Sequence, residues 1–183
     1  MKSNPINTSE EQIFSRIAHE VVEPVRQYLV RRTDPGMIDD LLSETLVVLW
    51  RRRGEIPPTP VPWAIGIARL QLSNAQRSTR RQSQLIQKII TLDPPPIIDT
   101  TDAVDDDDVL HAAMEELKPE EAEILRLWAW DELNITEISQ VLTTSKNAAS
   151  IRLHRAKRKL KTHLEKQMAS SDLVEEPKGD ATQ

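Results

Sequence analysis

The side chains best suited to chemistry lie near the end of the chain, where eight Lys and Arg residues and a single acidic residue fall between Lys146 and Lys166. Apolar or small residues recur there every three or four positions, which predicts a helix with one buried face. That face consists of Ala149, Leu153, Ala156, Leu160 and Leu164. At about 100° per residue, the opposite face carries Asn147, Ala148, Ile151, His154, Arg155 and Arg158.

This outward face suits the major groove of DNA. Small side chains near the start of a helix let it approach base edges, while cations further along hold phosphates. An exposed Ile151 could also touch a thymine methyl group. The alternative is that the basic run is an ordinary solvated face, as charge runs often are, and that Ile151 is a single apolar surface residue.

The preceding residues favour the DNA-reading interpretation. A short helix is predicted over residues 136–142, followed by Thr143-Thr144-Ser145 and the basic helix from Lys146. Ser145 can accept hydrogen bonds from the first free N–H groups of that helix. This spacing is typical of a helix-turn-helix unit.

Three further helices are predicted in the first half of the chain, over residues 9–32, 37–53 and 61–81. Asp34-Pro35-Gly36 reads as a turn between the first two, and Pro24 should bend the first. Four prolines between Ile56 and Pro62 predict a stiff loop before the third. The third helix carries Trp63 at its start and a basic cluster, Arg77, Arg80 and Arg81, at its end.

The charge pattern divides the chain into parts. Residues 82–108 contain three consecutive prolines and four consecutive aspartates, Asp105 to Asp108, a composition typical of a mobile connector. We therefore expect an all-α fold of two small helical domains, residues 9–81 and 109–167, joined by a flexible acidic linker over residues 82–108. Helices are predicted at residues 109–117 and 119–130 in the second domain, and residues 168–183 should form a frayed tail.

Composition excludes several function classes. The chain of 183 residues has no cysteine, which rules out disulfides and thiolate metal sites and fits a reducing cytosol. Its start lacks the pattern of a signal peptide, and no apolar run is long enough to cross a bilayer. The net charge of −5 does not argue against nucleic acid, because the acidity lies in the connector and the tail. We expect a cytoplasmic protein.

The sequence also resembles a known family. ITEISQVL at residues 135–142, followed by NAASIRLHRAK at 147–157, resembles region 4 of extracytoplasmic-function sigma factors in the sigma-70 family. DDLLSETL at 39–46 with LWRR at 49–52 resembles region 2.2, and WAIGIAR at 63–69 resembles the start of region 2.4. The motifs stand in the family's order and span about residues 14–164.

The resemblance implies a transcription initiation factor, not an enzyme, that binds core RNA polymerase through the β′ clamp coiled coil and the β flap, recognises the −35 and −10 promoter elements, and assists strand opening. It also implies control by an anti-sigma factor and no cofactor. The implied polymerase-binding residues are Asp39, Asp40, Ser43, Glu44, Val47 and Trp50. The implied −10 residues are Trp63, Arg69, Leu70, Asn74, Arg77, Arg80 and Arg81. The implied −35 residues are Lys146, Asn147, Ala148, Ser150, Ile151, Arg152, His154, Arg155 and Arg158.

Elementary chemistry supports these roles, and each role also has a purely structural alternative. Carboxylates at Asp40 and Glu44 share one helix face and could steer association, or could simply complement the positive end of their helix. Trp63 could stack on an unpaired base, or could be a core aromatic. The chain departs from the family at Leu70, where Asn is frequent, and at Ser43, where Gln is usual. It also has Asn147-Ala148-Ala149 in place of the commoner Gly-Thr-Val.

Two other functions remain open at this stage. A stand-alone helix-turn-helix repressor or activator would use the same basic helix but would have no need for the acidic surface around Asp40 and Glu44. A metal-dependent hydrolase would use Asp105 to Asp108 with histidines, although consecutive aspartates in a linker point in different directions and lack supporting hydrogen bonds.

Overall fold

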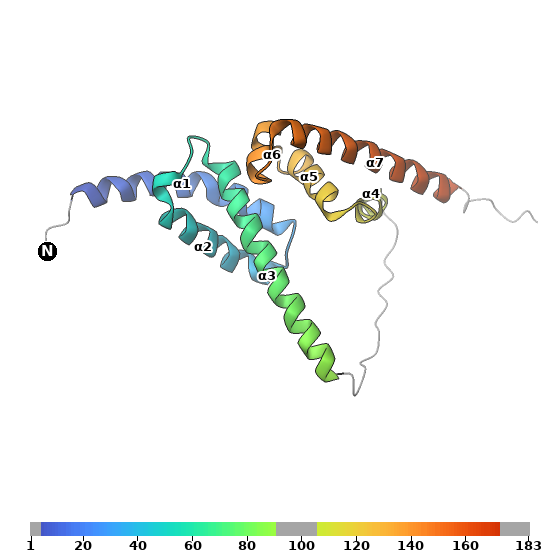
Figure 1. The fold of residues 1–183 in the computed structure, drawn as a ribbon, viewed down its shortest axis with the longest axis horizontal. Helices are drawn as coiled ribbons and strands as arrows, with labels where there is room; N and C mark the ends of the chain where they lie inside the picture. The colour runs from blue at the N-terminus through green and yellow to red at the C-terminus, as the bar shows by residue number, and fades with distance from the viewer. Residues whose placement is uncertain (1–4, 91–105, 173–183) are drawn as a thin grey trace, which may run out of the picture.

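The computed structural model describes the backbone of residues 5–90 and 106–172, and the side chains of residues 11–81 and 110–167. Over these ranges the chain is helical and contains no strand, which confirms the predicted all-α class. Figure 1 shows α1, α2 and α3 grouped together, with α4 to α7 beside them. The α-helices are α1 (Pro5–Val30), α2 (Pro35–Arg51), α3 (Pro60–Ile90), α4 (Asp106–Glu115), α5 (Pro119–Ala129), α6 (Ile135–Val141) and α7 (Lys146–Asp172).

The first half is a bundle in which α1, α2 and α3 pack against one another. Each helix contributes an apolar stripe, and the buried residues at its centre include Val25, Leu29, Leu41, Leu49, Ile65 and Ala68. Thr45 is the one polar residue among the buried residues of α2 and is fully buried. Its hydroxyl donates to the Leu41 carbonyl at 2.7 Å, so burial leaves no unsatisfied donor.

Proline sets the helix boundaries in this half. Pro35 occupies the first turn of α2, where its missing N–H costs nothing and its fixed φ is already helical. A short 3-10 turn, Arg53–Glu55, ends the run after α2, and Pro60 opens α3 after the proline-rich loop. The predicted turn at residues 34–36 and the predicted loop therefore lie where the sequence placed them, within about two residues. Pro24 lies inside α1, which continues through it.

The predicted linker is partly helical. Helix α3 continues to Ile90, and α4 begins at Asp106, so both ends of the range 82–108 belong to helices. Residues 91–105 lie outside the described residues, as do residues 173–183 of the predicted tail, while α7 continues to Asp172. Residues 106–108 form the first turn of α4.

Helices α4 to α7 form the second half. Both α4 and α5 pack along α7, and α6 crosses its start. The buried side chains here include Met114, Ile124, Leu127, Ile138 and Leu153. Because α7 is long and contacts all three shorter helices, it is the element that organises this half.

The two halves pack against each other in this structure. Helix α6 packs against α3, and the buried apolar residues of both halves form one contiguous cluster. The α3–α6 approach is close at Gly66, where a Cβ atom would lie 3.6 Å from both the Cα and the carbonyl oxygen of Val141. The physical reason is that α6 keeps an apolar face for α3, a pairing that charge counts along the chain do not reveal. Asn147, Ile151 and Arg155 nevertheless stay exposed.

None of the helices described here is both long enough and apolar enough to cross a membrane.

Candidate nucleic-acid interface

Helices α6 and α7 form a helix-turn-helix unit whose ends are capped by side chains. Asn134 accepts hydrogen bonds from the Thr136 and Glu137 N–H groups at 2.9 and 3.1 Å, and Glu137 accepts from the Asn134 N–H at 2.8 Å. This reciprocal arrangement satisfies free donors at the start of α6. Ser145 accepts from the Ala148 N–H at 3.1 Å, as predicted for the start of α7.

The turn between the two helices bends through Thr143, which has φ 50°. That left-handed conformation is unfavourable for a β-branched residue. The Thr143 N–H still bonds the Gln140 carbonyl at 3.2 Å, and the Thr144 N–H bonds the Ser139 carbonyl at 2.9 Å. These bonds fix the angle at which α7 leaves the turn.

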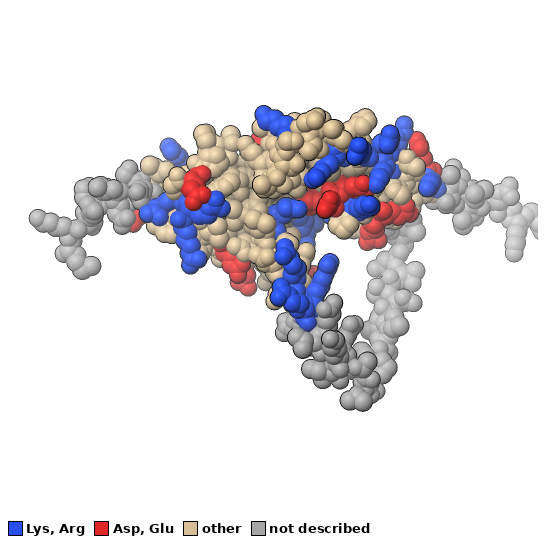
Figure 2. All heavy atoms as spheres, viewed as in Figure 1, with Lys and Arg blue, Asp and Glu red and all other residues tan. Residues whose placement is uncertain are grey.

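Helix α7 has the two faces that the sequence predicts. Ala149, Leu153 and Ala156 are buried, and Leu160 and Leu164 are partly buried. The opposite face is open to solvent: Lys146, Asn147, Ser150, Ile151, Arg152, His154, Arg155 and Arg158 are exposed, and Ala148 is partly exposed. Between Lys146 and Arg152 the first two turns present small and polar side chains, and Arg155 and Arg158 follow. Figure 2 shows Lys and Arg side chains gathered along α7 and on the lower part of α3.

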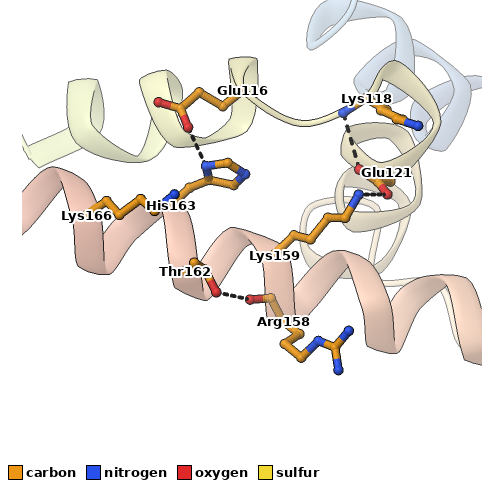
Figure 3. Close-up of a pocket in the computed structure, with 8 residues that line it drawn as sticks. All are labelled: Glu116, Lys118, Glu121, Arg158, Lys159, Thr162, His163 and Lys166. Carbon is orange, nitrogen blue, oxygen red and sulfur yellow. Dashed lines mark hydrogen bonds and ion pairs between the residues drawn. The ribbon is translucent and has the colours of Figure 1, made fainter.

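Not every cation of α7 is available to a partner. Lys159 donates to Glu121 of α5 at 2.5 Å, and this hydrogen bond, with the Lys118 N–H and the nearby positive charges, lowers the pKa of Glu121. Lys157 lies 3.1 Å from the ring centroid of Trp128, a cation–π contact. His163 pairs with Glu116, the residue after α4. Figure 3 shows Lys159 and His163 directed at α5 and α4, whereas the Arg158 guanidinium points away from them.

The residues singled out on α2 form a surface on the other half. Asp39, Asp40, Ser43, Glu44 and Val47 are all exposed. Asp39 pairs with Arg26 of α1. Trp50 is partly buried and meets Phe14 edge to face, with ring centroids 4.9 Å apart. Trp50 thus braces α1 against α2 at the end of this surface.

The residues singled out on α3 fall into two groups. Asn74, Arg77, Arg80 and Arg81 are exposed along the lower part of the helix, and Arg77 donates to the Ser73 hydroxyl at 2.9 Å. Trp63, Arg69 and Leu70 instead line a groove. The opposite wall of that groove includes Gln140, Thr143 and Thr144 of the second half.

The groove also contains Arg52, which belongs to the LWRR motif at residues 49–52 but to which no site role was assigned. The Arg52 guanidinium lies 5.1 Å from the centroid of the Trp63 ring and pairs with Glu55 at 2.6 Å. Two features of the sequence could have identified Arg52: its place in the LWRR motif and its position beside the proline-rich loop. Its charge would complement a nucleic-acid backbone passing over Trp63.

Among the residues whose side chains are described, no group of three His, Asp or Glu residues could hold a metal ion. The side chains of Asp105 to Asp108, on which the hydrolase alternative depended, lie outside that set.

Comparisons with known proteins agree with this arrangement. Residues 107–160 match the family model described as sigma-70, region 4, a range that begins in α4 and ends within α7. No curated protein matches the chain.

Two solved structures are similar over most of their length. CnrH, solved in complex with the cytosolic domain of CnrY, is 18% identical with a TM-score of 0.52, covering 87% of this chain and 89% of that one. The sigma factor RpoE of Bartonella quintana, solved in complex with the anti-sigma factor NepR, is 15% identical with a TM-score of 0.55, covering 85% and 96%. At these identities the likeness establishes the fold.

The matched region 4, the region 2 motifs that precede it and the fold of a solved sigma factor agree with one another. Residues 107–160 of the chain therefore belong to a sigma-70 region 4, and the chain as a whole has the fold of the solved sigma factor RpoE.

Proposed function

We propose that this chain binds core RNA polymerase and directs it to promoters, with α7 reading the −35 element and α3 engaging the −10 element. Helices α1 to α3 act as region 2, and α4 to α7 act as region 4. The exposed face of α7 is the observation that carries the proposal. This face exposes Asn147, Ile151 and Arg155, which could enter a major groove. The cations that contact the rest of the domain are different ones: Lys159 bonds Glu121, and Lys157 lies over Trp128.

The polymerase side of the proposal rests on α2. The exposed carboxylates of Asp40 and Glu44 stand on one face with Ser43 and Val47, and this face suits a basic helical partner such as the β′ clamp coiled coil. Acidic groups in such a place speed association and fix register. Region 4 would meet the β flap, so the two halves would be placed by two separate contacts on the polymerase.

Strand opening would fall to α3. Trp63, with Arg52 and Arg69 beside it, offers an aromatic surface and cations, the combination that binds single strands through stacking and phosphate contacts. Asn74, Arg77, Arg80 and Arg81 would follow the backbone from there. Leu70 stands exposed in this series and would contact a base or sugar through its apolar surface only.

The regulation and location follow from the same proposal. The two similar structures are complexes with CnrY and with the anti-sigma factor NepR, and we propose that an anti-sigma factor likewise controls this chain. Because core polymerase and promoter DNA are cytoplasmic, we place the chain in the cytoplasm.

Reconstituted transcription tests the proposal. Purified chain added to core polymerase should yield run-off transcripts from a restricted set of promoters in genomic DNA, and core polymerase alone should not. Sequencing the transcript starts would then define the −35 and −10 sequences. A chain that binds an operator tightly without polymerase, and yields no transcripts with it, would instead be a stand-alone helix-turn-helix regulator.

A further inference from the structure

A buried ionic cluster joins the two halves of the molecule; we call it the latch. It consists of four residues. Tyr28 lies on α1 and Arg32 just after it, while Glu123 lies on α5 and Asp131 just after it. The Arg32 guanidinium donates to Glu123 at 3.0 Å and to Asp131 at 2.7 Å. The Tyr28 hydroxyl donates to Glu123 at 3.1 Å.

The latch is shielded from water. The Arg32 and Asp131 side chains are 5% and 3% exposed, and that of Glu123 is 15% exposed. Burial, and then the Glu123 carboxylate, raises the pKa of Tyr28. Burial alone would lower the pKa of Arg32, but Glu123 and its other neighbours outweigh it and raise the pKa. Both shifts favour the forms that Tyr28 and Arg32 ordinarily have at neutral pH, the neutral phenol and the charged guanidinium.

Arg31 makes further hydrogen bonds between the two halves next to the latch. Its guanidinium donates to the Trp130 carbonyl at 2.6 Å and to Asp131 at 3.2 Å. Removing one member of a buried ion pair leaves an uncompensated charge, which is strongly unfavourable. Since every pair in the latch joins the first half to the second, that penalty opposes separation of the halves until water reaches the charges.

The closed arrangement brings the two proposed DNA-reading sets together. Leu70 of the −10 set lines the same groove as Thr144, which stands two residues before Lys146 of the −35 set. The promoter elements, by their names, lie about 25 base pairs apart, roughly 85 Å of duplex at about 3.4 Å per base pair. One closed body cannot reach both elements at once, and α6 lines the same groove as Trp63, Arg69 and Leu70 of the −10 set.

We propose that the latch holds the chain in an autoinhibited closed form, and that it must break before α3 and α7 can engage their promoter elements. This inference rests on the proposed function for the roles of the two sets. The closed form itself does not depend on those roles, so the two can be tested separately.

The absence of cysteine allows a direct test with two introduced thiols. Gln76 of α3 and Glu120 of α5 line one surface depression between the halves and belong to neither reading set. A chain with Gln76→Cys and Glu120→Cys, carrying donor and acceptor dyes, should show high energy transfer when free. Adding Arg32→Ala should lower the transfer, and so should the isosteric Glu123→Gln. Arg16→Ala, which removes an exposed guanidinium from α1, should leave it unchanged.

Locking the same two thiols tests autoinhibition. A short bis-maleimide with a reducible spacer should yield a crosslinked monomer. If it captures about nine-tenths of the chains, run-off transcription with core polymerase should fall about tenfold and return on reduction. Chains with only one of the two thiols should keep full activity after the same treatment.

The outcomes separate the two proposals. The latch would be overturned by low energy transfer in the free parent chain. It would also be overturned if Arg32→Ala left the energy transfer unchanged in a chain that circular dichroism shows to be folded. Full transcription from the locked monomer would overturn autoinhibition and leave the sigma-factor role standing. Transcripts absent even from the reduced chain would sink the proposed function, while the energy-transfer result would still decide the closed form.

Discussion

Ile151 and Leu153 stand two residues apart on α7 and face opposite ways, Ile151 with 43% of its surface exposed and Leu153 with 8%. Two residues of an α-helix differ by about 200° around its axis, so one helix separates packing from recognition. Substitutions at the two positions should therefore have different consequences.

Leu153→Ala should destabilise the second half by about 2–5 kcal/mol, the usual cost of emptying a leucine site in a core. Ile151→Ala should change stability by no more than about 0.5 kcal/mol, yet weaken binding to the preferred −35 sequence through loss of its apolar contact. Denaturant unfolding and DNA binding, measured on both variants, check this. Equal destabilisation by both would mean that Ile151 is packed in solution.

The salt dependence of DNA binding should identify the cations that touch phosphates. Replacing Arg155 and Arg158 together by Ala should lower the slope of log K against log salt by about two, since each lost phosphate contact removes about 0.9. The matched control is Lys157→Ala with Lys159→Ala, which removes two cations already engaged with Trp128 and Glu121. The slope of the control should stay within about half a unit of the parent. Similar slopes for both double variants would place Arg155 and Arg158 off the DNA.

The sequence predicted the helices and the faces of α7 because both depend on local periodicity. The buried stripe from Ala149 to Ala156 repeats every three or four residues, and such repeats are visible in any window of two turns. The caps are equally local: Ser145 accepts from the N–H three residues ahead. For the same reason, the helical ends of the predicted linker were missed, since Asp106 to Asp108 resemble linker composition while lying in the first turn of α4.

The latch could not be predicted from the same evidence. Arg32 lies 91 residues from Glu123 and 99 from Asp131 along the chain, and each of the three looks like an ordinary charged surface residue in its own window. Net charge suggested a tether between separate domains, whereas the packing of α6 on α3 brings these charges together. Arg52 was missed for a related reason: its contact with Trp63 exists only once the intervening proline-rich loop has folded.

The turn of the helix-turn-helix unit offers a test of backbone geometry. Thr143 has φ 50°, whereas the φ of Thr144 is not positive. Thr143→Gly should be neutral or stabilising, because glycine removes a left-handed penalty of about 1–2 kcal/mol while adding roughly 0.5–1 kcal/mol of unfolded-state entropy. Thr144→Gly meets only the entropic cost and should destabilise. Thermal unfolding of the two variants measures their stabilities. A larger loss of stability from Thr143→Gly than from Thr144→Gly would contradict the turn geometry.

The α2 surface should govern how fast the chain finds polymerase. Glu44→Lys reverses one exposed charge on the proposed clamp-binding face, and Glu20→Lys makes the same change on the exposed side of α1. If the partner is basic, Glu44→Lys should slow association with core polymerase and weaken its salt dependence, because charges at a contact act mainly on the encounter rate. Glu20→Lys shifts the net charge equally, so it reports any effect of overall charge alone. Stopped-flow association at two ionic strengths measures both. Equal slowing by the two variants would mean that net charge, and not the α2 face, steers the encounter.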